Sequence, residues 1–337
     1  MWYTLIILLD VFLAWFLTSQ IISFAEWTCG YVITRELVVS ILKSYYVPSG
    51  FATLLSYAPN AGLIGIYYLF SLPASPWFCS LSIWEYMRTN HLKMKTYQMF
   101  PDGNSIKDRV LKEVTEYKHY TDEQIIYAVA PHGKFSENIA FGFTLNYKVF
   151  GQVTTVVTSL LFWVPLIREF ASLAGCVPAT SANISHLLDE GKSIVISPEG
   201  LRQVLHTGPL GTMMILRGIP GECDPRKGFI RLAVASKNKH RIKIVPVYTR
   251  GSDQLLYTTL DIPVLRWLQK KLLKVYYYPL PVICFGFYGS FWPKRVNTEI
   301  SCCFGEPICV DTDGSVDDIH NTFCESMEKL INLSRNM

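Results

Sequence analysis

The sequence QIIYAVAPHGKFSE, residues 124–137, decides the fold that we expect for this chain. Its first seven residues form a short apolar run with β-branched side chains, which is typical of a strand buried on both faces. Pro131 and Gly133 interrupt that run, and Ser136 is a suitable N-cap for a helix over 136–146. A buried strand that leads through a turn into a helix is the repeating unit of an α/β sheet.

Similar strand and helix patterns alternate along the rest of the chain. Helices are predicted over 106–120, 164–175, 182–191 and 228–238, and strands over 152–162, 192–197 and 242–248. Gly175 and Gly191 should end two of the helices, because glycine readily adopts the left-handed conformation found there. We therefore expect an α/β fold with a mostly parallel sheet flanked by helices.

The composition of the chain and its N-terminal sequence both indicate a membrane protein. Half of the 337 residues are apolar and only 17% are charged, against about 25% in an average soluble domain. Residues 2–24 are long and apolar enough to span a bilayer. No Lys or Arg precedes them, so we favour a retained anchor over a signal peptide. A second apolar stretch, 51–84, is interrupted by prolines and fits either a hairpin in the bilayer or one span with an interfacial segment.

Four basic residues follow this apolar part and place its C-terminal end on the cytosolic side: Arg88, His91, Lys93 and Lys95. We expect membrane-embedded segments over 1–87, a linker over 88–104 and a catalytic domain over 105–337. The net charge of +4 is too small to indicate nucleic acid binding. Because the seven histidines form neither H-E-x-x-H nor H-x-x-x-H, we expect no metal site.

Three polar segments follow predicted strands, where active groups of such sheets gather: APHGKFSE (130–137), SPEGLR (197–202) and YTRGSD (248–253). In the first, Glu137 on the helix could hold one imidazole nitrogen of His132 and make the other a better base. Taken alone, a histidine in a turn is more often a solvated loop residue.

The other polar groups are equally ambiguous when each is read alone. Glu199 and Arg202, separated by Gly200, could bind a polar head group or form a local surface ion pair. Arg226 and Lys227 precede a predicted helix and could bind phosphate, including the phosphates of coenzyme A. Ordinary solvated charges explain that pair equally well.

In this order, the segments resemble the diacylglycerol acyltransferase type 2 family, which includes monoacylglycerol and wax-ester acyltransferases. The segment APHG stands where that family has His-Pro-His-Gly, and SPEGLR resembles the Pro-Glu-Gly-Thr-Arg block of the related glycerophospholipid acyltransferases. The resemblance extends through further blocks over roughly residues 90–335: RKGFIRLA (226–233), IVPVYTRGSD (244–253), FWPKR (291–295), GEPICV (305–310) and HNTFCESMEKL (320–330).

The resemblance implies an O-acyltransferase that moves a fatty acyl group from acyl-CoA to a glycerolipid alcohol, in the first place diacylglycerol, to give triacylglycerol. His132 would be the base and Glu137 its partner, while Pro131 and Gly133 would shape the turn and the oxyanion site. Transfer would be direct, without a cofactor, a metal or a covalent enzyme intermediate. Substrate binding would fall to Glu199, Gly200, Arg202, Arg226, Lys227, Gly228 and Phe229.

Departures from the family pattern keep the acceptor open. Ala130 replaces the first signature His, while Arg250 and Ser252 replace a Phe and a Glu. Residues 205–222 resemble a loop insertion. Monoacylglycerol, wax-alcohol and lysophospholipid acyltransferases therefore remain alternatives, as does an inactive lipid-binding membrane protein. The resemblance also implies an endoplasmic reticulum membrane location with access to lipid droplets, and a homo-oligomer stays open.

Overall fold

A computed structural model describes most of the chain from residue 72 onward. The described residues are 43, 72–102, 105–113, 123–133, 136–150, 153–164, 167–204, 208–221, 224–252, 257–258, 263–264, 267–268, 270–271, 284–285, 299–310 and 315–335. The apolar run over 2–24, the larger part of the stretch over 51–84 and the block FWPKR lie outside them. Within the described residues, no helix has the length and apolar character that a bilayer crossing requires.

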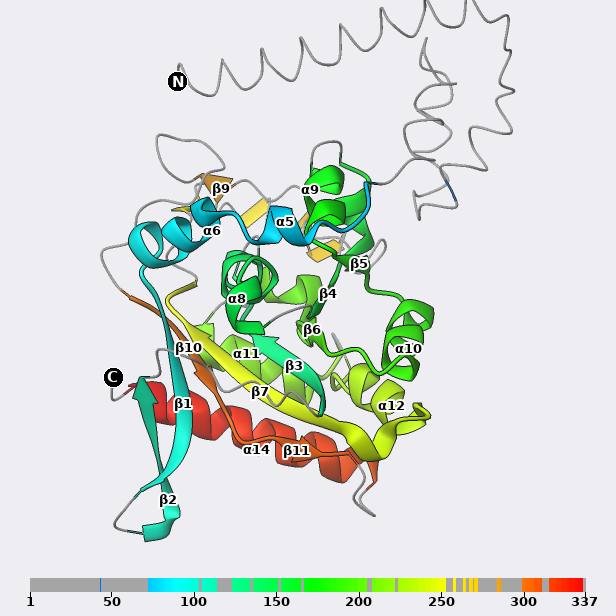
Figure 1. Ribbon diagram of the computed structural model, residues 1–337. Coiled ribbons are helices and arrows are strands. Elements are labelled where there is room, and N and C mark those ends of the chain that lie inside the picture. The colour runs from blue at the N-terminus through cyan, green and yellow to red at the C-terminus, as the bar shows by residue number, and fades with distance from the viewer. Residues whose placement is uncertain are drawn as a thin grey trace, which may run out of the picture.

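A nine-stranded sheet forms the centre of the described structure, with the strand order β2-β1-β10-β7-β3-β6-β4-β5 and with β11 paired to β7 (Figure 1). The strands are β1 Met94–Asp102, β2 Ser105–Glu113, β3 Gln124–Ala130, β4 Thr154–Val157, β5 Val177–Pro178, β6 Ile194–Ile196, β7 Ile242–Arg250, β10 Ile300–Phe304 and β11 Ile308–Cys309. Strands β8 Tyr257–Thr258 and β9 Cys284–Phe285 pair separately.

The direction of the strands divides the sheet into two parts. Strands β7, β3, β6, β4 and β5 are parallel neighbours. Strand β10 runs antiparallel to β7, β1 is parallel to β10, and β2 closes the edge antiparallel to β1. The sheet is therefore mixed, and the parallel arrangement predicted from the sequence holds for its five-stranded part.

Helices cover both faces of the sheet. One side carries α5 Pro76–Cys79, α6 Ser82–Tyr86, η1 Met87–His91, α7 Glu137–Ile139, η2 Ala140–Thr144, α8 Tyr147–Phe150, η3 Ser159–Phe162 and α9 Ile167–Leu173. Further helices with described bounds are α10 Ser181–Asp189, η4 Gly200–Val204, α11 Gly208–Arg217, α12 Gly228–Ala235, η5 Lys239–Arg241 and α14 Val316–Arg335. Figure 1 shows α8 and α14 on opposite sides of β3 and β7.

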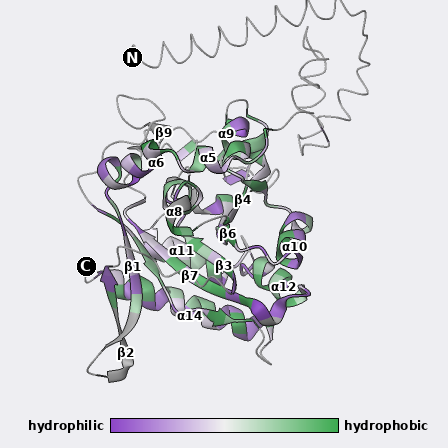
Figure 2. Cartoon of the chain, viewed as in Figure 1, coloured by the Kyte–Doolittle hydropathy of each residue, from purple (hydrophilic) through white to green (hydrophobic). Residues whose placement is uncertain are grey.

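Strand β3 contributes side chains to the hydrophobic core on both faces of the sheet, because successive side chains of a strand point in opposite directions. Tyr127 packs against an aromatic cluster with Phe143, Phe150 and Phe304, whose ring centroids lie 5.5–6.2 Å from its own. Ala128 faces the other core, which α10, α12 and α14 complete. Figure 2 shows the corresponding hydrophobic colouring along β7, the parallel neighbour of β3.

Several predicted elements are confirmed. The apolar runs at 124–130, 192–197 and 242–248 form β3, β6 and β7, and three predicted helices are α9, α10 and α12. Gly175 and Gly191 follow α9 and α10 with φ angles of 74° and 76°. The helix predicted over 136–146 is present as α7 followed by the π-helical η2, and the predicted strand over 152–162 is the shorter β4 followed by η3.

Three predictions about the chain's organisation were wrong. The helix expected over 106–120 is, over its described part, strand β2, which pairs with β1. Residues 94–102, expected in a linker, form β1 and pair with β10 from the far end of the chain. The expected loop over 205–222 contains helix α11. Pairing of β1 with β10 and of β2 with its neighbour β1 outweighs the local preference, which is a weak guide by itself.

We expect Gly305→Ala to destabilise the fold. A Cβ at this position would lie 2.9 Å from Pro246 Cγ and 3.1 Å from Leu330 Cδ1, so the junction of sheet and α14 would have to shift. Overpacking of this kind costs about 1–3 kcal/mol. Gly228→Ala is the matched control, because nothing lies within 4 Å of its added Cβ. Thermal unfolding of the purified variants measures the difference, and equal midpoints would contradict the expectation.

Candidate active site

The turns that follow β3 and β6 meet at one edge of the sheet. The two strands are parallel neighbours, with Tyr127 opposite Val195, so their carboxyl ends lie side by side. The first turn carries His132 and the second carries Glu199 and Gly200. The expectation that APHGKFSE and SPEGLR come together at the strand ends is therefore confirmed.

His132 is buried, with 5% of its surface exposed, and its ring is held across the two turns. Its Nε2 lies 2.9 Å from the carbonyl oxygen of Gly200. Because a carbonyl oxygen only accepts hydrogen bonds, Nε2 must carry the proton and Nδ1 is the basic nitrogen. Burial lowers the pKa of the imidazole, and the hydrogen bond to Gly200 opposes that shift in part. The neutral ring is thus ready to accept a proton.

The turn around His132 is fixed by its own residues. Gly133 has a φ of 73°, a conformation that glycine adopts without steric cost. The Asn138 side chain donates a 2.8 Å hydrogen bond to the carbonyl of Pro131 and so ties helix α7 to the turn. Nothing in the sequence indicated this role of Asn138, since an asparagine within a helix has no distinctive pattern.

The predicted partner of His132, Glu137, and the predicted helix cap, Ser136, are neighbours at the start of α7. Glu137 begins α7, but its side chain lies outside the described part of the structure, so its pairing with His132 stays a prediction. Ser136 directs its Oγ toward Nδ1 of His132, at 3.4 Å. Its φ is 58°, an uncommon value for a residue with a side chain.

Glu199 is fully buried beside this histidine. Desolvation raises the pKa of its carboxyl to about 8, although the Thr212 hydroxyl, the backbone of His132 and the charge of Arg226 hold that pKa down in part. Neither carboxyl oxygen completes a hydrogen bond of normal geometry with another described residue. Burial therefore favours the neutral, protonated form of Glu199. The surface ion pair that the sequence allowed for Glu199 is excluded by this burial.

The other predicted binding residues are more dispersed. Arg202 lies half-buried in η4, and Arg226 reaches the site through its electrostatic influence on Glu199. Lys227 forms a 2.7 Å ion pair with Asp317 of α14, and Gly228 is the first residue of α12. Phe229 is buried, and its ring packs edge-on against Phe323 at 5.3 Å in the core, so its role in binding stays a prediction.

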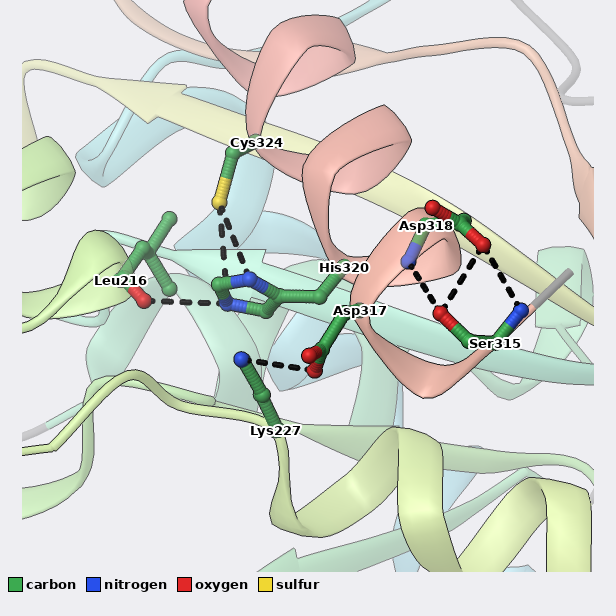
Figure 3. Close-up of polar contacts among 7 residues, drawn as sticks. All are labelled: Leu216, Lys227, Ser315, Asp317, Asp318, His320 and Cys324. Atoms are coloured by element: carbon green, nitrogen blue, oxygen red, sulfur yellow. Dashed lines mark hydrogen bonds and ion pairs between the residues drawn. The ribbon is translucent and has the colours of Figure 1, made fainter.

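Figure 3 shows the polar contacts that helix α14 makes with Leu216 and Lys227. His320 Nε2 lies 3.0 Å from the carbonyl oxygen of Leu216, in the last turn of α11, and Cys324 Sγ lies 3.7 Å from the same nitrogen. Together with Arg217 and Lys227 these side chains line a surface hollow of about 420 Å³. Among the described residues, no three His, Cys, Asp or Glu side chains are grouped so that they could hold a metal ion.

Comparison with known proteins places the chain in a family. Residues 80–336 match the family model described as diacylglycerol acyltransferase. The chain belongs to the diacylglycerol acyltransferase family. It is accordingly an acyltransferase, and the low identities to its relatives make it a divergent member.

The relatives are similar over much of their length. Human 2-acylglycerol O-acyltransferase 1 is 23% identical, covering 92% of this chain and 90% of its own. Diacylglycerol O-acyltransferase 1 of Saccharomyces cerevisiae is 25% identical over 77% of this chain and 67% of its own. Among solved structures, the 1-acyl-sn-glycerophosphate acyltransferase of Thermotoga maritima covers 90% of this chain and 95% of its own, with 11% identity and a TM-score of 0.43.

The buried carboxyl of Glu199 should make stability depend on pH. Between its ordinary pKa of 4.5 and the folded-state value of about 8, the folded protein keeps a proton that the unfolded chain releases. The free energy of unfolding should therefore fall as pH rises through this window, by about 1.4 kcal/mol for each unit of pKa difference.

Glu199→Gln should remove this dependence, because the amide has no proton to lose. We expect the wild-type unfolding midpoint to drop between pH 5 and pH 9 and that of the variant to drop less. Thermal unfolding of both proteins in the same detergent and buffers measures the difference. Parallel curves across the whole range would show that Glu199 is not held protonated.

Proposed function

We propose that this acyltransferase moves a fatty acyl group from acyl-CoA to a glycerolipid alcohol, in the first place diacylglycerol, to give triacylglycerol. The observation that carries the proposal is the buried, neutral His132, whose Nε2 is held by Gly200 and whose Nδ1 is directed away from that bond. Such a ring can act only as a base at Nδ1, and acyl transfer to an alcohol requires a base at the attacking hydroxyl.

The chemistry follows from this arrangement. Nδ1 of His132 accepts the proton of the acceptor hydroxyl as the oxygen attacks the acyl carbonyl, a contribution of about 10²–10⁴-fold to the rate. The carbon–sulfur bond of the thioester then breaks, and coenzyme A leaves as the thiol with the proton from Nδ1. The backbone N–H of Gly133 is our candidate for stabilising the oxyanion. Protonated Glu199 can donate a hydrogen bond from its buried carboxyl, which suits an oxygen of the acceptor or of the acyl group.

The names of the relatives support a neutral acceptor. They include acyltransferases of 2-acylglycerols, of diacylglycerols and of wax alcohols. The block SPEGLR supports a lysophospholipid instead, and this remains the second candidate. We further propose that residues 1–87 hold the enzyme at the endoplasmic reticulum membrane with its catalytic domain toward the cytosol, where acyl-CoA and glycerolipids both reach it, and with access to lipid droplets.

Removal of the base should abolish activity without loss of fold. We expect His132→Ala to lower the rate of acyl transfer from radiolabelled acyl-CoA by at least about 100-fold, in line with the usual contribution of a general base. His186→Ala is the matched control, because this histidine lies on the surface of α10 with 72% of its side chain exposed. A His132→Ala variant with wild-type turnover would exclude His132 as the base.

An acceptor panel tests the substrate. The wild-type enzyme should acylate diacylglycerol faster than monoacylglycerol, a long-chain alcohol or lysophosphatidate, when each is supplied in mixed micelles with the same labelled acyl-CoA. His132→Ala serves as the blank for each acceptor. Preference for lysophosphatidate would replace the neutral-lipid assignment by the phospholipid one, while leaving the reaction type intact.

A further inference from the structure

Helix α9 distributes its side chains in the reverse of the pattern that is usual at a protein surface. The charged Arg168 is buried, with 1% of its surface exposed, whereas Ile167 and Phe170 are 44% and 38% exposed. Val164, which is 39% exposed, precedes them at the same spacing of three residues, so the three apolar side chains share one face. A helix that faces water shows the opposite pattern, with its apolar side toward the core.

The two charged residues of this helix compensate each other. Arg168 Nη1 forms an ion pair with Glu169 Oε1 at 3.2 Å, and the Glu169 side chain is only 26% exposed. The helix therefore presents apolar side chains and little net charge to its surroundings. Pairing of this kind is the way in which ionisable groups are accommodated next to hydrocarbon, because an unpaired charge is costly there.

Helices α5 and α6 extend this apolar surface, although they lie much earlier in the chain. The Phe170 ring packs edge-on against Phe78 at 5.3 Å and against Trp84 at 5.8 Å. The backbone N–H of Ser75 donates a 2.8 Å hydrogen bond to the Leu173 carbonyl at the end of α9. Figure 1 shows the three helices together at one end of the described structure. We call their exposed apolar side chains the α9 face: Trp77, Ile83, Tyr86, Val164, Ile167 and Phe170.

The α9 face is connected to the edge of the sheet that carries His132. Strand β4 is parallel to β6, so its carboxyl end at Val157 lies at the edge where the turns after β3 and β6 meet. From this edge the chain continues through η3 into α9. The segment between Val157 and α9 therefore leads from the neighbourhood of the reactive histidine to the apolar surface.

A lipid bilayer is the occupant that fits the composition of the α9 face. Helix α5 and most of α6 belong to the apolar stretch 51–84, so the face continues a segment that we propose to lie at the membrane. Trp77 and Tyr86 are of the two residue types that are enriched at membrane–water interfaces. Contiguous exposed apolar side chains, unlike single ones, mark a surface that contacts a partner or a membrane.

We propose that the α9 face lies in the headgroup region of the bilayer, so that the lipid acceptor reaches His132 directly from the membrane. This rests on the membrane location proposed above and adds to it a contact made by the catalytic domain itself. The N-terminal segments hold the enzyme at the membrane, and the α9 face orients the active site toward the bilayer. The acyl chains of an acceptor such as diacylglycerol then stay out of water on the way to the site.

A photoreactive side chain identifies what covers the α9 face. Benzoylphenylalanine replaces Ile167 in the full-length enzyme, which is irradiated in vesicles of phosphatidylcholine and diacylglycerol and analysed by mass spectrometry. We expect covalent lipid adducts at this position. The same side chain in place of His186 is the control and should collect none, because His186 lies on the surface of α10 with 72% of its side chain exposed. Absence of lipid at position 167, or adducts there with a second protein chain instead, would overturn the proposal.

The double variant Val164→Ser, Ile167→Ser tests the consequence for catalysis. We expect the apparent KM for diacylglycerol in vesicles to rise about threefold or more, with kcat within about twofold, because a weaker bilayer contact reduces the supply of acceptor and leaves the base intact. Leu210→Ser is the matched control, since Leu210 is a 74% exposed apolar side chain on α11, and its KM should equal that of the wild type. An unchanged KM in the double variant would contradict the proposal.

The outcomes separate this inference from the proposed function. If position 167 collects no lipid and the double variant behaves as the wild type while His132→Ala is inactive, the α9 face is not a membrane contact but the acyl-transfer function stands. If wild-type enzyme does not sediment with the vesicles, the membrane location fails, and this inference fails with it. Lipid adducts at position 167 together with the raised KM support both.

Discussion

The hydrogen bond between His132 Nε2 and the Gly200 carbonyl is the constraint on which the site depends. It forms because β3 and β6 are parallel neighbours, so the turns that follow them lie next to each other at one edge of the sheet. A carbonyl can only accept, so this one contact decides which ring nitrogen carries a proton and which can take one. The register of two buried strands thereby determines which ring nitrogen of His132 carries the proton. Among the contacts described, no charged partner takes part.

Burial acts on the two titratable groups in opposite directions and makes both neutral. Desolvation lowers the pKa of His132 and raises that of Glu199 to about 8. In water at neutral pH, the carboxyl would be ionised and the imidazole partly protonated. In the interior, desolvation favours the neutral form of each group, because an isolated buried charge costs free energy. The result is a free base next to a free acid, a combination suited to moving the proton of a hydroxyl group.

Local sequence correctly predicts the strands that are buried on both faces. The apolar runs of β3, β6 and β7 are buried on both faces, so composition alone indicates strands, and the meeting of His132 with Gly200 follows from the ends of those strands. Strand β2 was missed because its helix-like pattern is overridden by pairing with β1. The contact of Ser136 with Nδ1 of His132 was also missed, because a serine before a helix is usually a cap.

Support for the site from distant parts of the chain is still harder to read from sequence. Thr212, whose hydroxyl faces Glu199, lies on α11, within residues that resembled a loop insertion. The end of α11 is held by α14, since His320 Nε2 bonds to the Leu216 carbonyl and Arg217 forms an ion pair with Glu328. The C-terminal helix thus fixes the helix that lies over the buried acid. A local motif indicates the reactive groups. Their surroundings depend on contacts between segments more than a hundred residues apart, such as the hydrogen bond between His320 and the Leu216 carbonyl.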